Sequence, residues 1–200
     1  MTGETTQGRA LARLLRLLLH GEQSAALAFE VLGRRRLRQG DAPALLSALQ
    51  HIAAEERQHV LLLSGLAREL PAIEFDSPVT TATECFFRGL ASRDAGVHFT
   101  RIAALDSAVC ILFATLRKSQ PALFHPVLQR IARDEARHVA LAARFARRLC
   151  TQPLQWNAAA ETRAGLADLL RHCADDLETL QIAPGRLLTR LREPPRFLRL

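Results

Sequence analysis

The chain has 200 residues, of which 48% are hydrophobic and 5% aromatic, and its formal net charge is +7. This length fits one domain whose core needs no covalent staple. The four cysteines, Cys85, Cys110, Cys150 and Cys173, form no C-x-x-C pair, which argues against a zinc knuckle, a rubredoxin-type iron site or a disulfide framework. The positive charge leaves acidic partners such as RNA or an acidic carrier protein open.

Helices are expected throughout, because Leu, Ala and Arg dominate while Gly and Pro fall between periodic segments. The first long helix is expected over about residues 4–38. A short turn follows, in which Asp41 is a candidate N-cap. The second long helix is expected over 43–70, where Pro71 stops it.

A longer connection separates this first hairpin from the next one. Residues 75–78 are expected to form a loop, and the capping-box pattern of residues 81–84 predicts a short helix near 82–92. Two further long helices are expected over 94–117 and 122–150.

Two hairpins joined by one long crossover predict an all-α, ferritin-like four-helix bundle. The bundle is assigned to residues 1–150. Residues 151–200 are expected to form a C-terminal helical extension that packs on the bundle, with a helix at about 158–180 and a short one after Pro184.

Ligand-type residues interrupt the apolar stripes of two predicted helices. In the second helix Glu56 and His59 replace apolar residues, and in the fourth helix Glu135 and His138 do the same. Residues three apart share a helix face, so each pair can bind one metal ion.

A single carboxylate interrupts the stripe of each remaining helix: Glu22 in the first and Asp106 in the third. The four carboxylates lie about 14 to 18 positions from the turn of their hairpin, so they are expected to meet near the bundle midpoint. Four buried carboxylates would repel one another and cost several kcal/mol unless they were protonated, paired with arginines or bound to cations. Imidazole with carboxylate suits iron or manganese.

The segments Glu55-Glu56-Arg57-Gln58-His59 and Asp134-Glu135-Ala136-Arg137-His138 resemble the paired E-x-x-H motifs of the ferritin-like di-iron carboxylate superfamily. The second is similar to the D-E-x-R-H signature of acyl-carrier-protein desaturases and bacterial multicomponent monooxygenases. The resemblance covers about residues 10–150.

The resemblance implies a ligand set for two iron ions, with manganese or a mixed pair as alternatives: Glu22, Glu56, His59, Asp106, Glu135 and His138. Glu56 and Glu135 would bridge the two ions. Asp134 would hold a ligand histidine, as metal-bound imidazoles usually require, and Glu55 and Arg137 would support the site. The superfamily usually has Glu where this chain has Asp106, so the second ion is expected to be held less firmly.

Several other residues are weaker candidates. Glu30 competes with Glu22 but lies off the stripe, and His98 is a possible extra ligand. His20, His51 and His125 are expected at the surface, His172 and Cys173 are considered as lining of a site, and Cys110 is expected to be a packed core thiol.

These features favour an enzyme that uses dioxygen and an external electron donor to oxidise a small or carrier-bound organic substrate. An iron-storage protein and a tRNA-hydroxylase-like enzyme that binds RNA are the alternatives. The absence of Tyr excludes a tyrosyl radical. No apolar run reaches about 18 residues and no signal peptide is evident, so we expect a cytoplasmic protein without a membrane span, acting alone or as a homodimer.

Overall fold

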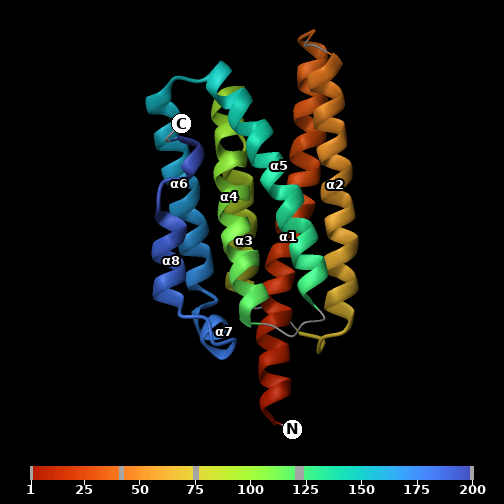
Figure 1. Ribbon diagram of the computed structural model, residues 1–200, viewed down its shortest axis with the longest axis vertical. Coiled ribbons are helices and arrows are strands. Elements are labelled where there is room, and N and C mark those ends of the chain that lie inside the picture. The colour runs from red at the N-terminus through yellow and green to blue at the C-terminus, as the bar shows by residue number, and fades with distance from the viewer. Residues whose placement is uncertain (1, 41–42, 74–76, 120–123, 199–200) are drawn as a thin grey trace.

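The computed structural model describes residues 2–40, 43–73, 77–119 and 124–198. Its four long helices, α1, α2, α4 and α5, stand side by side, and α6 and α8 lie along the outside of α4 (Figure 1). The fold class is therefore all-α, as predicted, with two hairpins joined by a crossover that contains α3. The helices are α1 (Thr2–Arg38), α2 (Pro43–Arg68), α3 (Ser77–Gly89), α4 (Ala95–Ser119), α5 (His125–Leu149), α6 (Gln152–Arg171), α7 (Ala174–Thr179) and α8 (Pro184–Arg192), followed by a short 3-10 helix, Arg196–Leu198.

Local chemistry fixes the ends of the second hairpin. Asp94 precedes α4, and its Oδ1 accepts a hydrogen bond of 2.9 Å from the backbone N–H of Val97, as an N-cap does. At Gly96 a Cβ atom would lie 2.5 Å from the Cβ of Cys150, so the start of α4 and the end of α5 approach as closely as only glycine allows. These contacts set the height of α4 against α5.

The crossover helix and the extension differ from the sequence-based prediction. Helix α3 begins at Ser77, so Ser77 and Pro78 form its first turn and the predicted capping box is wrong. The hydroxyl of Thr83 instead donates to the carbonyl of Val79 inside the helix. The single helix expected over 158–180 is also wrong: it is two helices, α6 and α7.

Other boundaries agree closely with the prediction. Helix α2 ends at Arg68, two residues before the predicted end. Helix α5 begins at His125 with Pro126 in its first turn, where its missing N–H costs no hydrogen bond. The predicted N-cap Asp41 and the predicted start of α5 near residue 122 lie outside the described residues.

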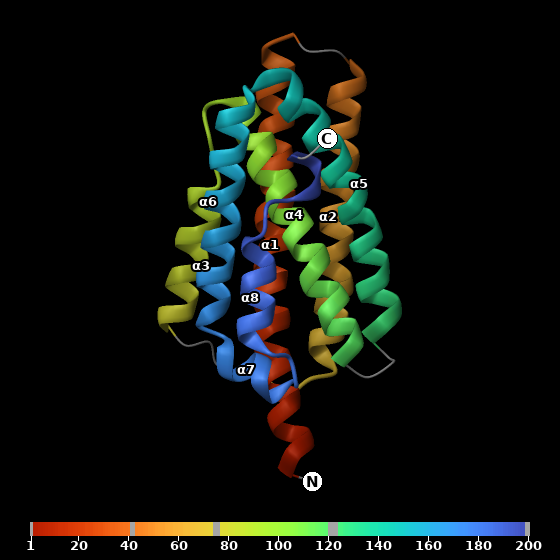
Figure 2. The same cartoon turned by 60° about the vertical axis from the view of Figure 1, so that its left-hand side comes forward.

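Contacts of two arginines, one buried and one partly exposed, tie the extension to the bundle. Arg163 of α6 is 3% exposed; its Nε donates to the carbonyl of Leu191 at 2.6 Å, and its Nη1 donates to Ser107 of α4 at 2.8 Å. Arg13 of α1 pairs with Asp176 of α7. The extension therefore covers one side of α4 and holds the helix that carries Asp106 (Figure 2).

Two apolar clusters occupy the two ends of the bundle. One is rich in leucine and includes Leu14, Leu63 and Leu112, and the other includes Phe29 and Phe99. The apolar stripes of the long helices run from one cluster to the other. The ligand-type residues interrupt these stripes midway between the two clusters. The fold thus places polar side chains in a layer sealed at both ends by close packing.

Helix α4 is, among the described residues, the one helix long and apolar enough to cross a membrane by length and composition. Half of its most apolar window is buried inside the bundle. It also carries Asp106 inward and packs against α5 and α6. These features are typical of a core helix of a globular bundle, and the cytoplasmic location stays a prediction.

Candidate metal centre

Six side chains with ligand chemistry meet in the middle of the bundle, one or two from each long helix. Glu22 comes from α1, Asp106 from α4, and the two Glu–His pairs come from α2 and α5. None of the six is more than 5% exposed. The structure thus brings together the whole ligand set expected from the sequence: Glu22, Glu56, His59, Asp106, Glu135 and His138.

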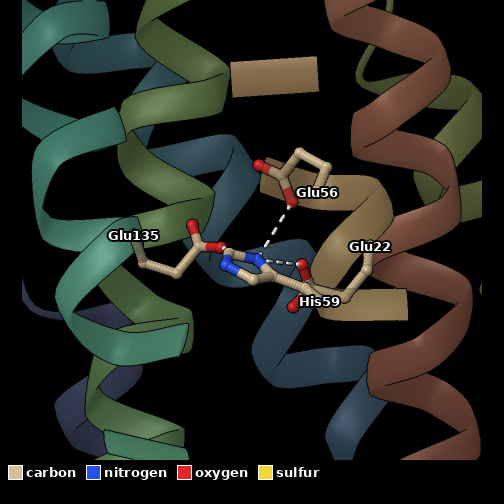
Figure 3. A group of neighbouring side chains, drawn as sticks. All are labelled: Glu22, Glu56, His59 and Glu135. Carbon is tan, nitrogen blue, oxygen red and sulfur yellow. Dashed lines mark hydrogen bonds and ion pairs between the residues drawn. The ribbon is translucent and has the colours of Figure 1, made fainter. Parts of the chain in front are cut away.

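The first half of the centre surrounds the His59 ring. Its Nδ1 lies 3.0 Å from Oε2 of Glu22, 3.5 Å from Oε2 of Glu56 and 3.4 Å from Oε1 of Glu135. Figure 3 shows Glu22 and Glu135 reaching this ring from opposite sides. Each of these four residues offers one donor atom, and the four atoms all lie within 4.8 Å of one another. This spacing can hold one ion.

The second half has fewer donors. Asp106, Glu135 and His138 offer three atoms within 4.8 Å of one another. Nδ1 of His138 lies 3.0 Å from Oε1 of Glu56 and 3.6 Å from Oε2 of Glu135. Glu135 belongs to both donor groups, and Glu56 approaches both imidazoles. The two glutamates of the E-x-x-H motifs therefore stand between the two halves.

Outer carboxylates hold the far side of each imidazole, and they do so across the bundle. Nε2 of His59 on α2 lies 3.1 Å from Asp134 on α5, whereas Nε2 of His138 on α5 lies 3.0 Å from Glu55 on α2. Arg137 pairs with both Asp134 and Glu55. A carboxylate on Nε2 fixes the proton there, so that Nδ1 of each ring presents a lone pair to an ion.

The electrostatics of the metal-free centre favour bound protons. Burial and repulsion from Glu135 raise the pKa of Glu22 and of Asp106 well above their usual values. Burial opposes the charged form of His138, but hydrogen bonding and attraction from Glu135 and Glu56 outweigh it and raise its pKa to about 11. The pKa of His59 is raised for the same reason. Ions that enter the centre must displace these protons.

The donor set fits a pair of divalent cations. Oδ2 of Asp106 is buried without a hydrogen-bond partner, and both oxygens of Glu56 and Nδ1 of His138 are buried without a well-aligned hydrogen bond, although Nδ1 of His138 and Oε1 of Glu56 form an ion pair at 3.0 Å. Buried polar atoms without partners are rare because each costs about 1–3 kcal/mol. These atoms of the centre are those that would face the ions, while the outer nitrogens of both imidazoles are occupied. Carboxylate and imidazole donors without thiolate suit iron or manganese.

Two cavities adjoin the centre. The inner cavity, about 30 Å³, lies beside Glu22, Glu56, Asp106 and Glu135. The outer cavity, about 410 Å³, is a mainly apolar space between α1, α3 and α4 that also reaches Asp106. Both are lined by Gly21, Ala25, Phe87, Leu105 and Asp106. The outer cavity has the size of a small-molecule site.

The weaker candidates lie outside the two donor groups. Glu30 pairs with Arg34 and Arg57, and His98 lies on the wall of the outer cavity. Cys110 donates to the carbonyl of Ala132, and burial raises the pKa of its thiol to about 12, so it is no thiolate ligand.

The remaining candidates differ in burial. His51 and His172 are exposed, His125 is half-buried, and Cys173 packs in the leucine-rich cluster. His20, which was expected at the surface, is half-buried, packs on Phe87 with ring centroids 5.5 Å apart, and lines the outer cavity. An off-stripe histidine gives no sequence signal for such a cavity, because the other wall is the distant α3.

Comparison with known proteins supports the fold. No protein-family model matches the chain, and no curated protein matches it significantly in sequence. Among solved structures, protein 19 with aldehyde deformylating oxidase activity from Synechococcus superposes with a TM-score of 0.70. The identity is 18%, and the match covers 96% of this chain and 88% of that one. The chain therefore shares the ferritin-like helical bundle fold of that protein.

Proposed function

We propose that this chain is a non-haem di-iron oxidoreductase that uses dioxygen to oxidise an organic substrate with an apolar body. The observation that carries the proposal is the pair of buried carboxylate and imidazole donor groups that converge in the middle of the bundle, in which Oδ2 of Asp106 has no hydrogen-bond partner. The oxidase activity of the structural neighbour and the cavity beside Asp106 support it. Iron storage needs no such cavity, which makes an enzyme the better reading.

Each half of the centre would hold one ion. Glu22, Glu56 and His59 would bind the first, Asp106, Glu135 and His138 the second, and Glu56 and Glu135 would bridge them. Asp134 and Glu55 would orient the histidines, and Arg137 would fix both of these carboxylates. When bound, two iron ions supply the electrons and open coordination positions that dioxygen activation requires.

The residues of the protein would bind the substrate and exclude water from the centre. The apolar walls of the outer cavity would take up the substrate body and keep bulk water from the centre. The inner cavity, with a volume near that of one water molecule, leaves room beside the ligands for a diatomic molecule or one end of a substrate. Electrons for repeated turnover would come from an external reductase.

The test is iron binding followed by reaction with air. Metal-free protein is titrated with Fe(II) under anaerobic conditions, and bound iron is measured before air is admitted. We expect about two ions per chain and new near-ultraviolet absorption after exposure to air. Glu56→Ala should lose both responses. Glu30→Ala is the matched control, because Glu30 lies on α1 but outside the donor groups. Wild-type protein that binds no iron would refute the proposal.

A further inference from the structure

Asp106 is held differently from Glu22 and the two ligand histidines. Oε2 of Glu22 lies 3.0 Å from Nδ1 of His59, and outer carboxylates hold the far side of both imidazoles. Oδ2 of Asp106, in contrast, is buried without a hydrogen-bond partner. The backbone of α4 therefore sets where this carboxylate lies.

Arg163 of α6 fastens α4 one residue beyond Asp106. Its Nη1 donates to Oγ of Ser107 at 2.8 Å. Its Nε donates to the carbonyl of Leu191 at 2.6 Å, and its Nη2 donates to that of Arg190 at 3.2 Å. Both carbonyls lie in the last turn of α8, where carbonyl groups have no partner inside the helix. One guanidinium thus joins α4, α6 and α8 next to a ligand-type residue.

The environment of Arg163 is unusual for a charged group. The side chain is buried, and all three acceptors of these bonds are neutral oxygens. Burial lowers the pKa of the guanidinium, and attraction from Glu193 opposes this effect. A buried charge is costly, whereas the planar, directed donors of arginine hold their acceptors in one arrangement. These properties suit a residue that fixes position rather than one that adds stability.

The same face of α6 reaches the inner cavity. Leu166 lies three positions after Arg163, so the two side chains share one face of the helix. Leu166 lines the inner cavity together with Leu105 and Asp106. Helix α6 therefore supports α4 at Ser107 and also forms part of the wall beside the ligand-type residues.

We propose that Arg163 is a positioning residue for Asp106, so that the C-terminal extension sets how firmly the second ion is bound. The bond from Arg163 to Ser107 would fix the rotation of α4 about its axis. Such control matters because sites of this kind need their ligands within about 0.5 Å of the productive position. The inference rests on the proposed function for the presence of the ion, but the surroundings of Asp106 can be measured without metal.

Stepwise titration of the metal-free full-length protein with Mn(II) measures the effect on each ion. The step that belongs to the second ion is identified by its loss in Asp106→Ala. Ser107→Ala removes one acceptor and leaves Arg163 its two contacts with α8. We expect the second ion to bind about tenfold more weakly in this variant, and the first ion to bind as before. Arg163→Met should have at least this effect, and Arg163→Lys, which keeps an N–H donor, should restore part of the affinity.

A double-mutant cycle shows whether the bond carries the effect. Arg163→Met combined with Ser107→Ala should weaken the second ion no more than Arg163→Met alone. Thr100→Val is the matched control, because Thr100 is also on α4 and its hydroxyl donates to the carbonyl of Gly96 within that helix. Thermal unfolding verifies that each variant is folded. Wild-type affinity for the second ion in Ser107→Ala, or equal weakening of both ions, would overturn the proposal.

Carbon-13 NMR of the metal-free protein tests the surroundings of Asp106 directly. With aspartate labelled at the carboxyl carbon, the Asp106 signal is identified by its loss in Asp106→Asn. We expect this signal to shift in Ser107→Ala and in Arg163→Met but not in Thr100→Val. An unchanged signal in the first two variants would overturn the proposal. If the wild-type protein binds no metal, the proposed function fails, while the carbon-13 signal still decides the role of Arg163.

Discussion

The two halves of the centre are built from the same motif but are not equivalent. In the first half Glu22 lies within hydrogen-bond distance of His59, and four donors converge. In the second half three donors converge, and Oδ2 of Asp106 has no hydrogen-bond partner. Asp106 also lines both cavities. We infer from this difference that the first half would hold its ion more firmly, and that the ion in the second half would be more accessible, because Asp106 is one methylene shorter than Glu22.

Removing either proposed bridging glutamate should reduce metal binding more than any other change. It should also remove the difference in ion affinity between the two halves. Glu56→Ala and Glu135→Ala should each lose most of the bound metal, because each carboxylate stands between the halves. Glu22→Ala should keep about one ion per chain, since only the first half is lost. Elemental analysis after dialysis measures this. A Glu56→Ala or Glu135→Ala protein that retains two ions would disprove the bridging role.

Removing one outer carboxylate should weaken ion binding in one half of the centre and leave the other half unchanged. Asp134→Asn loosens His59 and should affect the first ion, whereas Glu55→Gln loosens His138 and should affect the second. We expect each to weaken its own ion by about 10- to 100-fold. Competition with a chelator gives the two affinities. If both variants weakened the same ion, the assignment of histidines to halves would be wrong.

Exchanging the side-chain lengths at positions 22 and 106 should reverse the order of the two ion affinities. The changes in affinity should be smaller than those above. Asp106→Glu adds one methylene where the two cavities leave room, so the fold should tolerate it and the second ion should bind more tightly, by about tenfold. Glu22→Asp should weaken the first ion by a similar factor. Stepwise metal titration measures both affinities, and far-ultraviolet circular dichroism checks the fold. Unfolding of Asp106→Glu would show that Asp106 is a structural residue.

The smallest expected effect is the pH dependence of stability without metal. The folded state raises the pKa of Glu22, Asp106, His59 and His138, so it binds more protons than the unfolded chain. Stability from such groups is lost as pH rises.

We therefore expect the Tm of metal-free protein to fall by a few degrees between pH 6 and pH 9. Bound metal should become more stabilising over the same range, because ions displace the protons. Glu22→Gln and Asp106→Asn should each flatten the metal-free dependence. Differential scanning calorimetry with and without chelator measures the slopes, and a Tm that rises with pH in chelator would contradict the electrostatic account.

The sequence predicted the helices that bear the centre because their signals are local. Glu56 and His59 interrupt an apolar stripe, and a buried position at that spacing needs a partner. The sequence could not tell that Asp134 holds His59 rather than His138. That choice depends on how α2 and α5 cross, which no local pattern records.

The errors lie where packing overrides local signals. The capping box of residues 81–84 has the right residue types, but the crossover helix extends back to Ser77 and Thr83 bonds within it. The start of α6 at Gln152 has a local signal in Pro153, a residue suited to the first turn. The outer cavity had no sequence signal, since α3 forms one wall and its position on the bundle is a tertiary property.

Each ligand histidine is bonded by an outer carboxylate from the other hairpin, so neither hairpin contains a complete centre. The α1–α2 half depends on Asp134 of the other hairpin, and the α4–α5 half depends on Glu55 of the first. A shift of one helical turn between α2 and α5 would break both supports at once. Separately produced hairpins should consequently be poor metal binders, and affinity should return only when the two are mixed. Metal affinity would then report correct docking of one half-bundle on the other.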